Sequence, residues 1–166
     1  FYNLGPNHVH RKPSIAALES GTPVFCEKPL APTLSDAEAM ADAAGDAGVT
    51  HGCAFNYRFV PAIQYARNLI ADGELGEIHH VRGRYMQDWR VDPEAPWSWR
   101  NDEEMAGSGA LGDLGAHTVD LIHFLVGDAP GAGSIDRVSG QLQTFVDERP
   151  LAGEDETRPV TVDDAY

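Results

Sequence analysis

An aspartate and a histidine stand four positions apart, at Asp113 and His117, in a stretch whose apolar spacing predicts a helix over 111–127. Residues with this separation share one helical face, and the apolar residues that follow the 3.6-residue period lie on another. Histidine titrates near neutral pH, and an adjacent carboxylate can orient its ring or adjust its pKa. The pair is therefore a candidate general acid–base. A structural ion pair and a metal site stay open, although no second His or Cys cluster offers further ligands.

A lysine, Lys28, follows the apolar run 24–26 in the tripeptide Glu27-Lys28-Pro29. The run is typical of a buried strand, and proline ends it because proline cannot donate to a ladder. Lysine is rarely buried unless it is paired or functional. At the carboxyl end of a strand, an ammonium group could hydrogen-bond a substrate hydroxyl and stabilise the alkoxide character that develops as the proton leaves. An exposed ion pair with a neighbour is the alternative.

Two loops carry further candidates. Asn7 and His10 belong to "GPNHVH", where an asparagine at a strand end could bind a carboxamide or a ribose, while a histidine could equally be a cap or a surface residue. Trp97, Trp99 and Arg100 lie in a long irregular stretch. Aromatic faces beside a guanidinium suit sugar recognition, and they suit the anchoring of a loop equally well.

The sequence "GSGALG" at 107–112 has the G-x-G-x-x-G spacing of a dinucleotide-binding turn. Such a turn must follow a buried strand, open a helix and precede a second strand that ends in an acidic residue about twenty positions on. The polar residues 101–106 form no buried strand, and no such acidic residue follows. We therefore expect these glycines to let the backbone come close to a ligand or to a neighbouring segment.

The first part of the chain must position the lysine. Residues 1–57 alternate between strand-like apolar runs and helical stretches with short links. The predicted helices cover 12–21 and 33–49, and a capping box of Ser35 and Glu38 is expected to open the second helix. This alternation predicts a parallel sheet covered by helices, which binds ligands beyond the carboxyl ends of its strands.

The second part, residues 58–166, must position the aspartate and the histidine. It begins with an amphipathic helix predicted over 61–76, with proline at its start. Two segments, 77–89 and 135–147, alternate polar and apolar residues as half-buried strands do. The acidic segment 148–164 is expected to be an exposed connection. The predicted fold class is therefore α/β, with a parallel-sheet domain followed by a second domain.

The chain has 166 residues, of which 42% are hydrophobic, enough for one globular domain or for parts of two. It begins without Met, inside a strand-like run, so we expect a piece of a longer protein. No apolar run reaches the ~18 residues of a membrane span, and no signal sequence opens the chain, which predicts a cytoplasmic protein without membrane association. Cys26 and Cys53 form no C-x-x-C motif and are expected to be buried free thiols.

The formal net charge is −14, and only Lys12 and Lys28 are lysines among the twelve basic residues. Nucleic-acid binding needs basic stripes, so nucleic acid is disfavoured as a partner. An acid-rich, lysine-poor surface fits a high-salt cytoplasm, where the repulsion among carboxylates is screened. The codon usage of a GC-rich genome would explain the same composition, and both explanations stay open.

Several segments occur in the order of a known family. They are "GPNHVH", "VFCEKPLAPTLSDAEAM", "NYRFVPA", "GELGEIHHVRGRYMQDW" and "GSGALGDLGAHTVDLIHFLVG". Over nearly the whole chain they resemble the Gfo/Idh/MocA family, named for glucose–fructose oxidoreductase, inositol dehydrogenase and a rhizopine-catabolism protein. The E-K-P tripeptide and the G-x-x-x-D-x-G-x-H block make the resemblance specific.

The resemblance implies an N-terminal Rossmann domain, of which residues 1–57 would be the second half. It implies a C-terminal α/β domain with a large open, mainly antiparallel sheet, of which residues 58–166 would be the first part. It also implies NAD or NADP as the cofactor, hydride transfer to or from a sugar or polyol, and a homo-oligomer, dimer or tetramer, formed through the C-terminal sheet. The strand–helix unit with the family's phosphate-binding turn is not among these residues, so cofactor binding by this chain alone is an open expectation.

The resemblance also implies a role for each candidate residue. Lys28 would bond the reacting hydroxyl, Asp113 would contact the substrate, and His117 would be the acid–base. The residues implied near the nicotinamide end of the cofactor are Pro6, Asn7, His10, Glu27, Lys28 and Pro29. The residues implied around the substrate are Tyr57, Arg58, Trp97, Trp99, Arg100 and Asp113. No metal is expected.

Three other interpretations stay open. A sugar- or nucleotide-sensing protein of the same fold would bind its ligand without turnover. A metal-dependent hydrolase or lyase would use Asp113 and His117 as ligands. A degenerate fragment would have a structural role alone.

Overall fold

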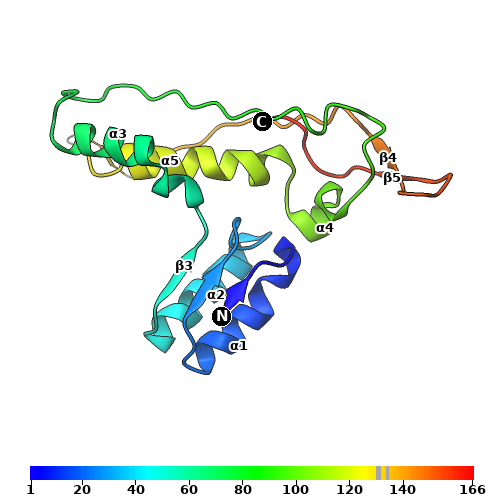
Figure 1. Cartoon of the computed structure of the whole chain (residues 1–166), viewed down its shortest axis with the longest axis horizontal. Coiled ribbons are helices and arrows are strands. Elements are labelled where there is room, and N and C mark those ends of the chain that lie inside the picture. The colour runs from blue at the N-terminus through cyan, green and yellow to red at the C-terminus, as the bar shows by residue number, and fades with distance from the viewer. Residues whose placement is uncertain (130–131, 134) are drawn as a thin grey trace.

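The computed structural model describes residues 1–129, 132–133 and 135–166, which form two regions joined after β3 (Figure 1). The first region holds a parallel sheet in the order β1–β2–β3, with a helix in each connection. This confirms the predicted alternation of strands and helices. The elements are β1 (Tyr2–Asn3), α1 (Arg11–Glu19), β2 (Val24–Cys26), α2 (Leu34–Ala47) and β3 (His51–Cys53).

The core of the first region lies between the central strand and the two helices. Leu18 of α1 and Met40 of α2 are buried against Val24 and Cys26 of β2. Alternate residues of a strand point to opposite faces, so Phe25 points away from this core and is 39% exposed. The helices therefore cover one face of the sheet, and the carboxyl ends of the strands point toward the second region (Figure 1).

The start of α2 differs from the prediction. Its N-cap is Thr33, whose Oγ1 accepts a hydrogen bond from the N–H of Asp36 at 3.2 Å. The predicted capping box of Ser35 and Glu38 is wrong, because Ser35 already lies inside the first turn. Gly48 ends the helix with a φ of 62°, a left-handed conformation that glycine adopts without strain.

The second region is built on two helices that lie side by side, α3 (Pro61–Ala71) and α5 (Ala116–Val126) (Figure 1). Arg67 of α3 joins them, because its Nε donates to the carbonyl oxygen of Phe124 at 3.0 Å and its guanidinium lies over the Phe124 ring. A π-helical turn over Leu111–Gly115, here called the π-turn, precedes α5. The predicted helix that carries the aspartate and the histidine is thus confirmed, with a wider first turn.

Two predictions for the second region are wrong. The acidic segment after residue 147 is an antiparallel hairpin, β4 (Glu148–Pro150) and β5 (Thr157–Pro159), rather than a mere connection, although residues 152–159 are exposed as predicted. The segments 77–89 and 135–147 form no ladder within the described part of the chain, apart from one antiparallel bridge at Gln143. Alternating polar and apolar residues suit a pleated surface, but a strand also needs a neighbour to pair with.

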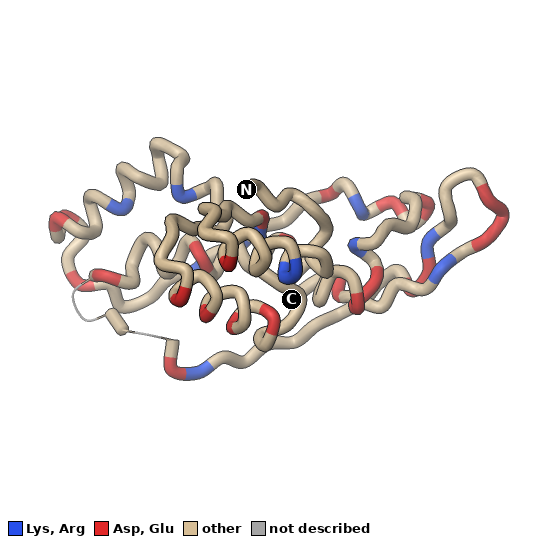
Figure 2. Tube along the Cα trace, turned by 90° about the horizontal axis from the view of Figure 1, so that it is seen from below, with Lys and Arg blue, Asp and Glu red and all other residues tan. Residues whose placement is uncertain are grey.

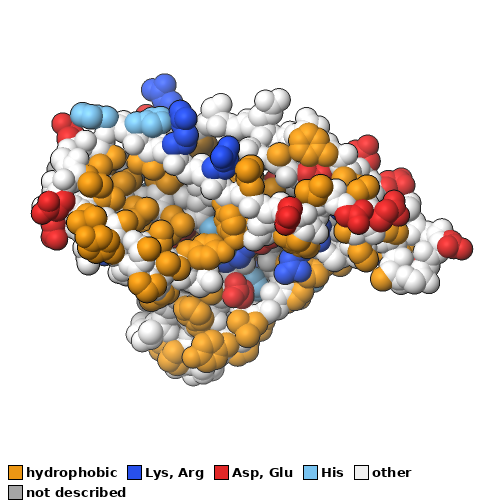
Figure 3. Space-filling view, turned by 45° about the horizontal axis from the view of Figure 1, so that its top comes forward, with side chains coloured by type: hydrophobic (Ala, Val, Ile, Leu, Met, Phe, Trp, Pro, Cys, Tyr) orange, Lys and Arg blue, Asp and Glu red, His pale blue; other side chains and the backbone are white. Residues whose placement is uncertain are grey.

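Both segments expose large apolar side chains. Val81 and Met86 on the first segment, and Val138, Leu142 and Phe145 on the second, are all exposed. Apolar side chains gather across the face that Figure 3 shows. Large apolar patches of this kind mark surfaces that another element or molecule covers.

A buried arginine fastens the hairpin to the loop that precedes the second region's short helix α4 (Glu103–Ala106). Arg149 on β4 is 1% exposed, and its two terminal nitrogens donate to the carbonyl oxygens of Asp92 and Arg90, each at 2.8 Å. A buried guanidinium group needs such acceptors, because water cannot reach it. The hairpin therefore holds this loop in place.

We expect Arg149→Met to lower the free energy of unfolding by about 3 kcal/mol, because the variant loses two hydrogen bonds from a charged donor, each worth about 1.5–3 kcal/mol. Urea denaturation measures this loss. Arg158→Met is the control, since Arg158 on β5 is exposed and lies over the ring of Trp97, a contact worth about 0.5–1 kcal/mol. Equal losses for the two variants would contradict the assigned role of Arg149.

Acidic residues are spread along the whole chain trace (Figure 2). They include Asp42 and Asp46 on α2 and the residues Glu154, Asp155 and Glu156 in the turn between β4 and β5, all of them exposed. Lysine and arginine form no continuous stripe in this view. Within the described ranges, every helix is too short or too polar to cross a membrane.

The two cysteines are neighbours across the parallel sheet. Cys26 and Cys53 are register partners in β2 and β3, and both are free thiols, the first buried and the second half-buried. This confirms the prediction of free thiols. Burial raises the pKa of the Cys53 thiol to about 12, so the thiolate that redox or metal chemistry requires is disfavoured at neutral pH.

Candidate active site

The predicted lysine and aspartate meet between the two regions. Lys28 follows β2, Asp113 lies in the π-turn, and 85 positions separate them in the sequence. Lys28 Nζ donates to Asp113 Oδ1 at 2.6 Å and to the carbonyl oxygen of Asp113 at 2.7 Å. The lysine side chain is 14% exposed and that of Asp113 is 39% exposed. The ammonium group is thus shielded, while its carboxylate partner still faces open space.

The π-turn sets the orientation of Asp113. The closing bond of the turn runs from the N–H of Ala116 to the carbonyl oxygen of Leu111, one residue further than in an α-helix. The N–H of Asp113 itself donates to the carbonyl oxygen of Gly109 at 2.9 Å. Turns of this kind inside helices are frequent at functional sites, and here the turn directs both the carboxylate and the carbonyl of Asp113 to the same ammonium group.

His117 lies one turn beyond Asp113 and is 7% exposed. Its ring packs against Tyr57, with the two ring centroids 4.6 Å apart, and against Phe55 and Tyr85 at 5.9 and 6.2 Å. The aromatic rings hold the imidazole in one place, with little contact with solvent.

Burial lowers the pKa of His117 below its ordinary value, and the positive charge of Lys28 lowers it further. The carboxylates of Asp113, Asp120 and Glu27 act in the opposite direction without reversing the shift. The imidazole is therefore neutral near pH 7, which is the form that can accept a proton.

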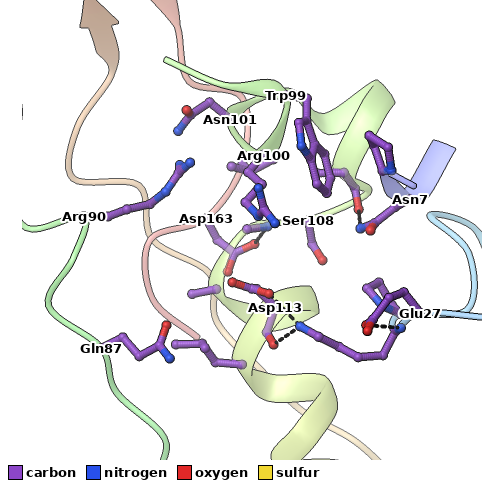
Figure 4. A pocket seen from close by; sticks show the side chains of 18 of the residues that line it. Asn7, Glu27, Gln87, Arg90, Trp99, Arg100, Asn101, Ser108, Asp113 and Asp163 are labelled. Carbon is purple, nitrogen blue, oxygen red and sulfur yellow. Dashed lines mark hydrogen bonds and ion pairs between the residues drawn. The ribbon is translucent and has the colours of Figure 1, made fainter. Parts of the chain in front are cut away.

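A cavity of about 340 Å³ opens beside the ion pair (Figure 4), a size typical of small-molecule sites. In Figure 4, Gln87 and Arg90 approach from one side and Trp99 and Arg100 from another, above Asp113. The lining residues come from the segments 4–7, 27–29, 87–90, 99–101, 106–114 and 162–164. The cavity thus lies where the carboxyl ends of the parallel strands face the π-turn.

Four carboxylates line this cavity, those of Glu27, Asp113, Asp163 and Asp164. All four already accept hydrogen bonds from the protein. Asp113 is paired with Lys28, and the other three accept from backbone N–H groups. The negative charges are therefore held in fixed positions rather than offered freely to a ligand.

Two arginines complete the basic groups of the lining. Arg90 Nη2 donates to Ser98 Oγ at 2.8 Å, and the Arg100 guanidinium lies 4.4 Å from the centroid of the Trp99 ring. Burial lowers the pKa of Arg90, and the charges of Arg149 and Arg100 lower it further, yet a guanidinium stays protonated in a protein. Donor-rich side chains next to an aromatic face can bind hydroxyl groups and pack against the apolar side of a ring.

Comparison with known proteins decides the family. Residues 4–55 match the family model described as oxidoreductase family, NAD-binding Rossmann fold, and residues 63–166 match the model of the GFO/IDH/MocA C-terminal domain. The chain belongs to the Gfo/Idh/MocA oxidoreductase family. The fold agrees with this assignment, since a Rossmann-like parallel sheet is followed by a region with antiparallel strands.

Relatives in the Gfo/Idh/MocA family include sugar dehydrogenases. The chain is 43% identical over 171 residues to levoglucosan dehydrogenase of Pseudarthrobacter phenanthrenivorans, a match that covers 96% of this chain and 42% of the relative. It is 33% identical over 136 residues to D-glucoside 3-dehydrogenase of Escherichia coli, covering 82% of this chain and 38% of the relative. The chain thus spans less than half the length of these relatives.

Solved structures in the family share the fold of this chain. A crystal structure of an oxidoreductase domain protein from Kribbella flavida is 53% identical, with a TM-score of 0.88, and the match covers 98% of this chain and 42% of that one. A structure of levoglucosan dehydrogenase in complex with NADH and levoglucosan is 43% identical, with a TM-score of 0.89, and covers 98% of this chain and 41% of that one.

The nucleotide-side residues that the Gfo/Idh/MocA resemblance implies divide into two groups. Pro6, Asn7, Glu27 and Pro29 line the cavity beside the lysine. His10 does not line it, and its side chain is 0% exposed. The residues at the two strand ends therefore come together, with the histidine beneath them.

The structure places His10 beneath the cavity rather than in its lining, and its implied place near the nicotinamide stays a prediction. Its Nε2 lies 2.8 Å from the carbonyl oxygen of Gly5, and its Nδ1 lies 3.1 Å from that of Pro29. A ring engaged on both sides by backbone groups has no nitrogen left for a ligand. His10 therefore ties together the two loops that line the cavity, rather than reaching into it.

The residues of the aromatic stretch "WSWR" lie in two different places in the structure. Trp99 and Arg100 line the cavity, as the resemblance implies for substrate-side residues. Trp97 lies outside the lining, and its ring nitrogen donates to the carbonyl oxygen of Pro159 at 3.0 Å. The alternative that the sequence left open, a loop anchor, describes Trp97.

Tyr57 and Arg58 also lie outside the cavity lining. The hydroxyl of Tyr57 is 2.6 Å from that of Tyr85, and its ring covers His117. Arg58 Nε donates to Asp120 Oδ2 at 2.9 Å, and the Asp120 carboxylate is buried. Both residues therefore surround His117, which also lies outside the cavity lining, and their implied contact with the substrate stays a prediction.

The glycines of "GSGALG" are explained by close backbone contacts. Gly107 has a φ of +84°, and a Cβ on it would lie 2.6 Å from the carbonyl oxygen of Pro32. A Cβ on Gly109 would lie 1.8 Å from the carbonyl oxygen of Asp163. No side chain fits at either position, which confirms the expectation that these glycines allow a close approach rather than form a nucleotide turn.

Several lining residues were not predicted from the sequence, among them Gln87, Trp89, Asp163 and Asp164. The sequence does contain a signal for Gln87 and Trp89. They are two positions apart in a segment predicted to be extended, so their side chains point to the same face. The second two follow an apolar alternation in which Val160 and Val162 are buried. Nothing in that alternation indicates which distant segment the aspartates contact.

Proposed function

We propose that this chain forms the nicotinamide side and the substrate side of an NAD(P)-dependent oxidoreductase that acts on a hydroxyl or carbonyl group of a sugar or polyol. The observation that carries the proposal is the 2.6 Å contact of Lys28 Nζ with Asp113 Oδ1 at a cavity between the two regions. The similarity to levoglucosan dehydrogenase and to D-glucoside 3-dehydrogenase supports a sugar as the substrate.

The residues at the carboxyl edge of the parallel sheet fit the nicotinamide end of NAD or NADP. Pro6 and Asn7 follow β1, Glu27 and Pro29 follow β2, and all four line the cavity, which is where open parallel sheets bind their ligands. A bound nicotinamide would supply the hydride acceptor or donor. The phosphate-binding turn that completes a dinucleotide site is not among these residues.

The side chains of this chain would handle the reacting oxygen and its proton. In the oxidative direction, Lys28 donates a hydrogen bond to the hydroxyl oxygen and stabilises its developing negative charge. His117 accepts the hydroxyl proton as a neutral imidazole. Asp113 orients the substrate and holds the ammonium group. Because Tyr57 covers one side of the imidazole, the proposal requires the hydroxyl group to approach the ring beside Asp113.

Cofactor reduction with a panel of sugars and polyols tests the proposal in the full-length protein. We expect absorbance at the NADH or NADPH wavelength to increase with at least one sugar, and the increase to require both the sugar and the oxidised cofactor. Binding of a sugar without turnover, with both cofactors tested, would contradict the proposal and favour a sensing protein of the same fold.

A metal-dependent hydrolase or lyase is the alternative chemistry for Asp113 and His117. The described residues contain no group of three or more His, Cys, Asp or Glu side chains that could hold a metal ion. The Asp113 carboxylate is also engaged by Lys28. Sugar conversion without a nicotinamide cofactor, abolished by a chelator, would favour this alternative.

We expect a neutral sugar to be a better substrate than its phosphorylated form. Four carboxylates face three basic groups in the lining of the cavity, so an added dianion meets net repulsion. We expect kcat/KM for the phosphorylated sugar to be about tenfold lower, which corresponds to about 1.4 kcal/mol. The difference should shrink in molar KCl, because salt screens exposed charges. Equal kcat/KM values at low salt would rule out this charge discrimination.

We also propose that the chain divides after residue 57, with the nucleotide side in 1–57 and the substrate side in 58–166. The exposed apolar side chains on 77–89 and 135–147 support a homo-oligomer formed through the C-terminal sheet. A cytoplasmic location stays a prediction.

A further inference from the structure

We propose that Asp163 is a positioning residue of this site, whose carboxylate fixes the turn that presents Asp113 to Lys28. The inference rests on the proposed function, in which this ion pair meets the substrate. Asp163 comes from the segment that follows the hairpin, far in the sequence from the residues that it holds.

Asp163 binds three consecutive backbone N–H groups at the start of the π-turn. Its Oδ1 accepts from Gly109 at 2.7 Å and its Oδ2 accepts from Leu111 at 2.7 Å. Its own carbonyl oxygen accepts from the N–H of Ala110 at 2.9 Å. Asp163 is 6% exposed, so these bonds are shielded from water. The first N–H groups of a helix lack partners within the helix, and one residue satisfies three of them here.

A single hydrogen bond connects this contact to Asp113. The carbonyl oxygen of Gly109, whose N–H is held by Asp163, accepts from the N–H of Asp113 at 2.9 Å. The negative carboxylate also lies at the N-terminal end of the helical segment, where it interacts favourably with the helix dipole. Any displacement of Gly109 therefore moves the backbone of Asp113 and changes its distance from Lys28.

The segment 107–109 is in close contact with the backbone of two other segments. A Cβ on Gly109 would lie 1.8 Å from the carbonyl oxygen of Asp163, and a Cβ on Gly107 would lie 2.6 Å from that of Pro32. Pro32 belongs to the first region, which also carries Lys28. Asp163 thus supplies one of the two contacts that set the position of the turn relative to the lysine.

The role of Asp163 is positioning rather than catalysis. Asp163 lines the cavity, but both of its carboxylate oxygens are engaged by backbone N–H groups. A carboxylate in that state does not need a ligand to satisfy it. Its effect on the reaction is expected to pass through Asp113.

Asp163→Asn in the full-length protein tests the inference. The amide keeps the size of the carboxylate but turns an NH₂ group toward a backbone donor. We expect faster hydrogen exchange at the N–H groups of Gly109 and Leu111. We also expect kcat to fall by roughly 10²-fold, because small errors in the placement of reacting groups have effects of this size. The KM for the cofactor should change little.

A double-mutant comparison separates positioning from general destabilisation. If Asp163 acts through Asp113, then Asp163→Asn should lower kcat far less in an Asp113→Asn background than in the parent, because contributions that share one path are not additive. Thr33→Ala is the control, since it removes the cap of α2 and should lower stability by about 1 kcal/mol without changing kcat. Multiplicative losses of kcat in the double variant would overturn the inference.

The exchange measurement also distinguishes this inference from the proposed function. If the parent protein reduces no cofactor with any sugar, the proposed function fails, while exchange at Gly109 and Leu111 still reports on the contact. Unchanged protection of both groups in Asp163→Asn would overturn the positioning role whatever the activity. Asp163→Ala, which removes both side-chain acceptors, gives a second variant, and we expect exchange at both N–H groups to be faster in it than in the parent.

Discussion

Lys28→Met is expected to lower kcat by roughly 10³-fold with the fold retained, because removal of one donor to a developing oxyanion typically has an effect of 10²–10³. Methionine fills much of the space of the lysine stem and offers no donor. The Asp113 carboxylate that loses its partner is 39% exposed, so water can solvate it. Steady-state cofactor reduction measures the loss, and thermal unfolding checks the fold.

The chain offers a matched control for this variant. Lys12 is the other lysine of the sequence, it is exposed in α1, and it does not line the cavity. Lys12→Met should leave kcat unchanged. If Lys28→Met reduces kcat no more than Lys12→Met does, the ammonium group has no part in the reaction.

His117→Gln is expected to lower kcat/KM for oxidation by roughly 10²–10⁴-fold, the range for loss of a general acid–base. Glutamine keeps polar atoms among the aromatic rings that pack on His117 but cannot accept the substrate proton at neutral pH. His123→Gln is the control, because His123 is exposed on the same helix. A turnover near that of the parent would exclude His117 as the base.

The pH dependence follows from the surroundings of His117. An imidazolium cannot accept a proton, so kcat/KM should fall as the pH drops through the pKa of His117. Burial and then the charge of Lys28 lower this pKa, so the midpoint should lie below the ordinary value of about 6.5. Lys28→Met removes the second cause and should move the pKa of His117 upward. An NMR titration of the ring measures the shift without substrate, and a downward shift would contradict the arrangement.

The parts of the site that could be predicted are the residues whose positions follow from patterns within one short segment of the sequence. Lys28 ends a short apolar run within a strand–helix alternation, and in a parallel sheet that position is the ligand-binding edge. Asp113 and His117 are four residues apart within an apolar helix period. The close-approach role of Gly107 and Gly109 followed from the absence of a strand before them. Each of these inferences needed only residues close in the sequence.

The parts that could not be predicted depend on contacts between distant segments. Nothing near Asp163 or Arg149 in the sequence shows that their side chains hold backbone groups more than fifty positions away. His10 looked available for a ligand because its backbone partners lie in two separate loops. The segments 77–89 and 135–147 have the period of strands, but periodicity does not name a pairing partner. The π-turn has no local signature of its own.

The ion pair at the centre of the site has a consequence for stereochemistry. An ammonium group carries three N–H bonds in a fixed tetrahedral arrangement, and Lys28 directs two of them to the carboxylate and the carbonyl of Asp113. A single direction is left for an incoming oxygen atom. Under the proposed function, an epimer with the reacting hydroxyl inverted would fill the same space, but its oxygen would lie off that direction. We therefore expect the orientation of Lys28, set by the backbone and the carboxylate of Asp113, to select one configuration at the carbinol carbon.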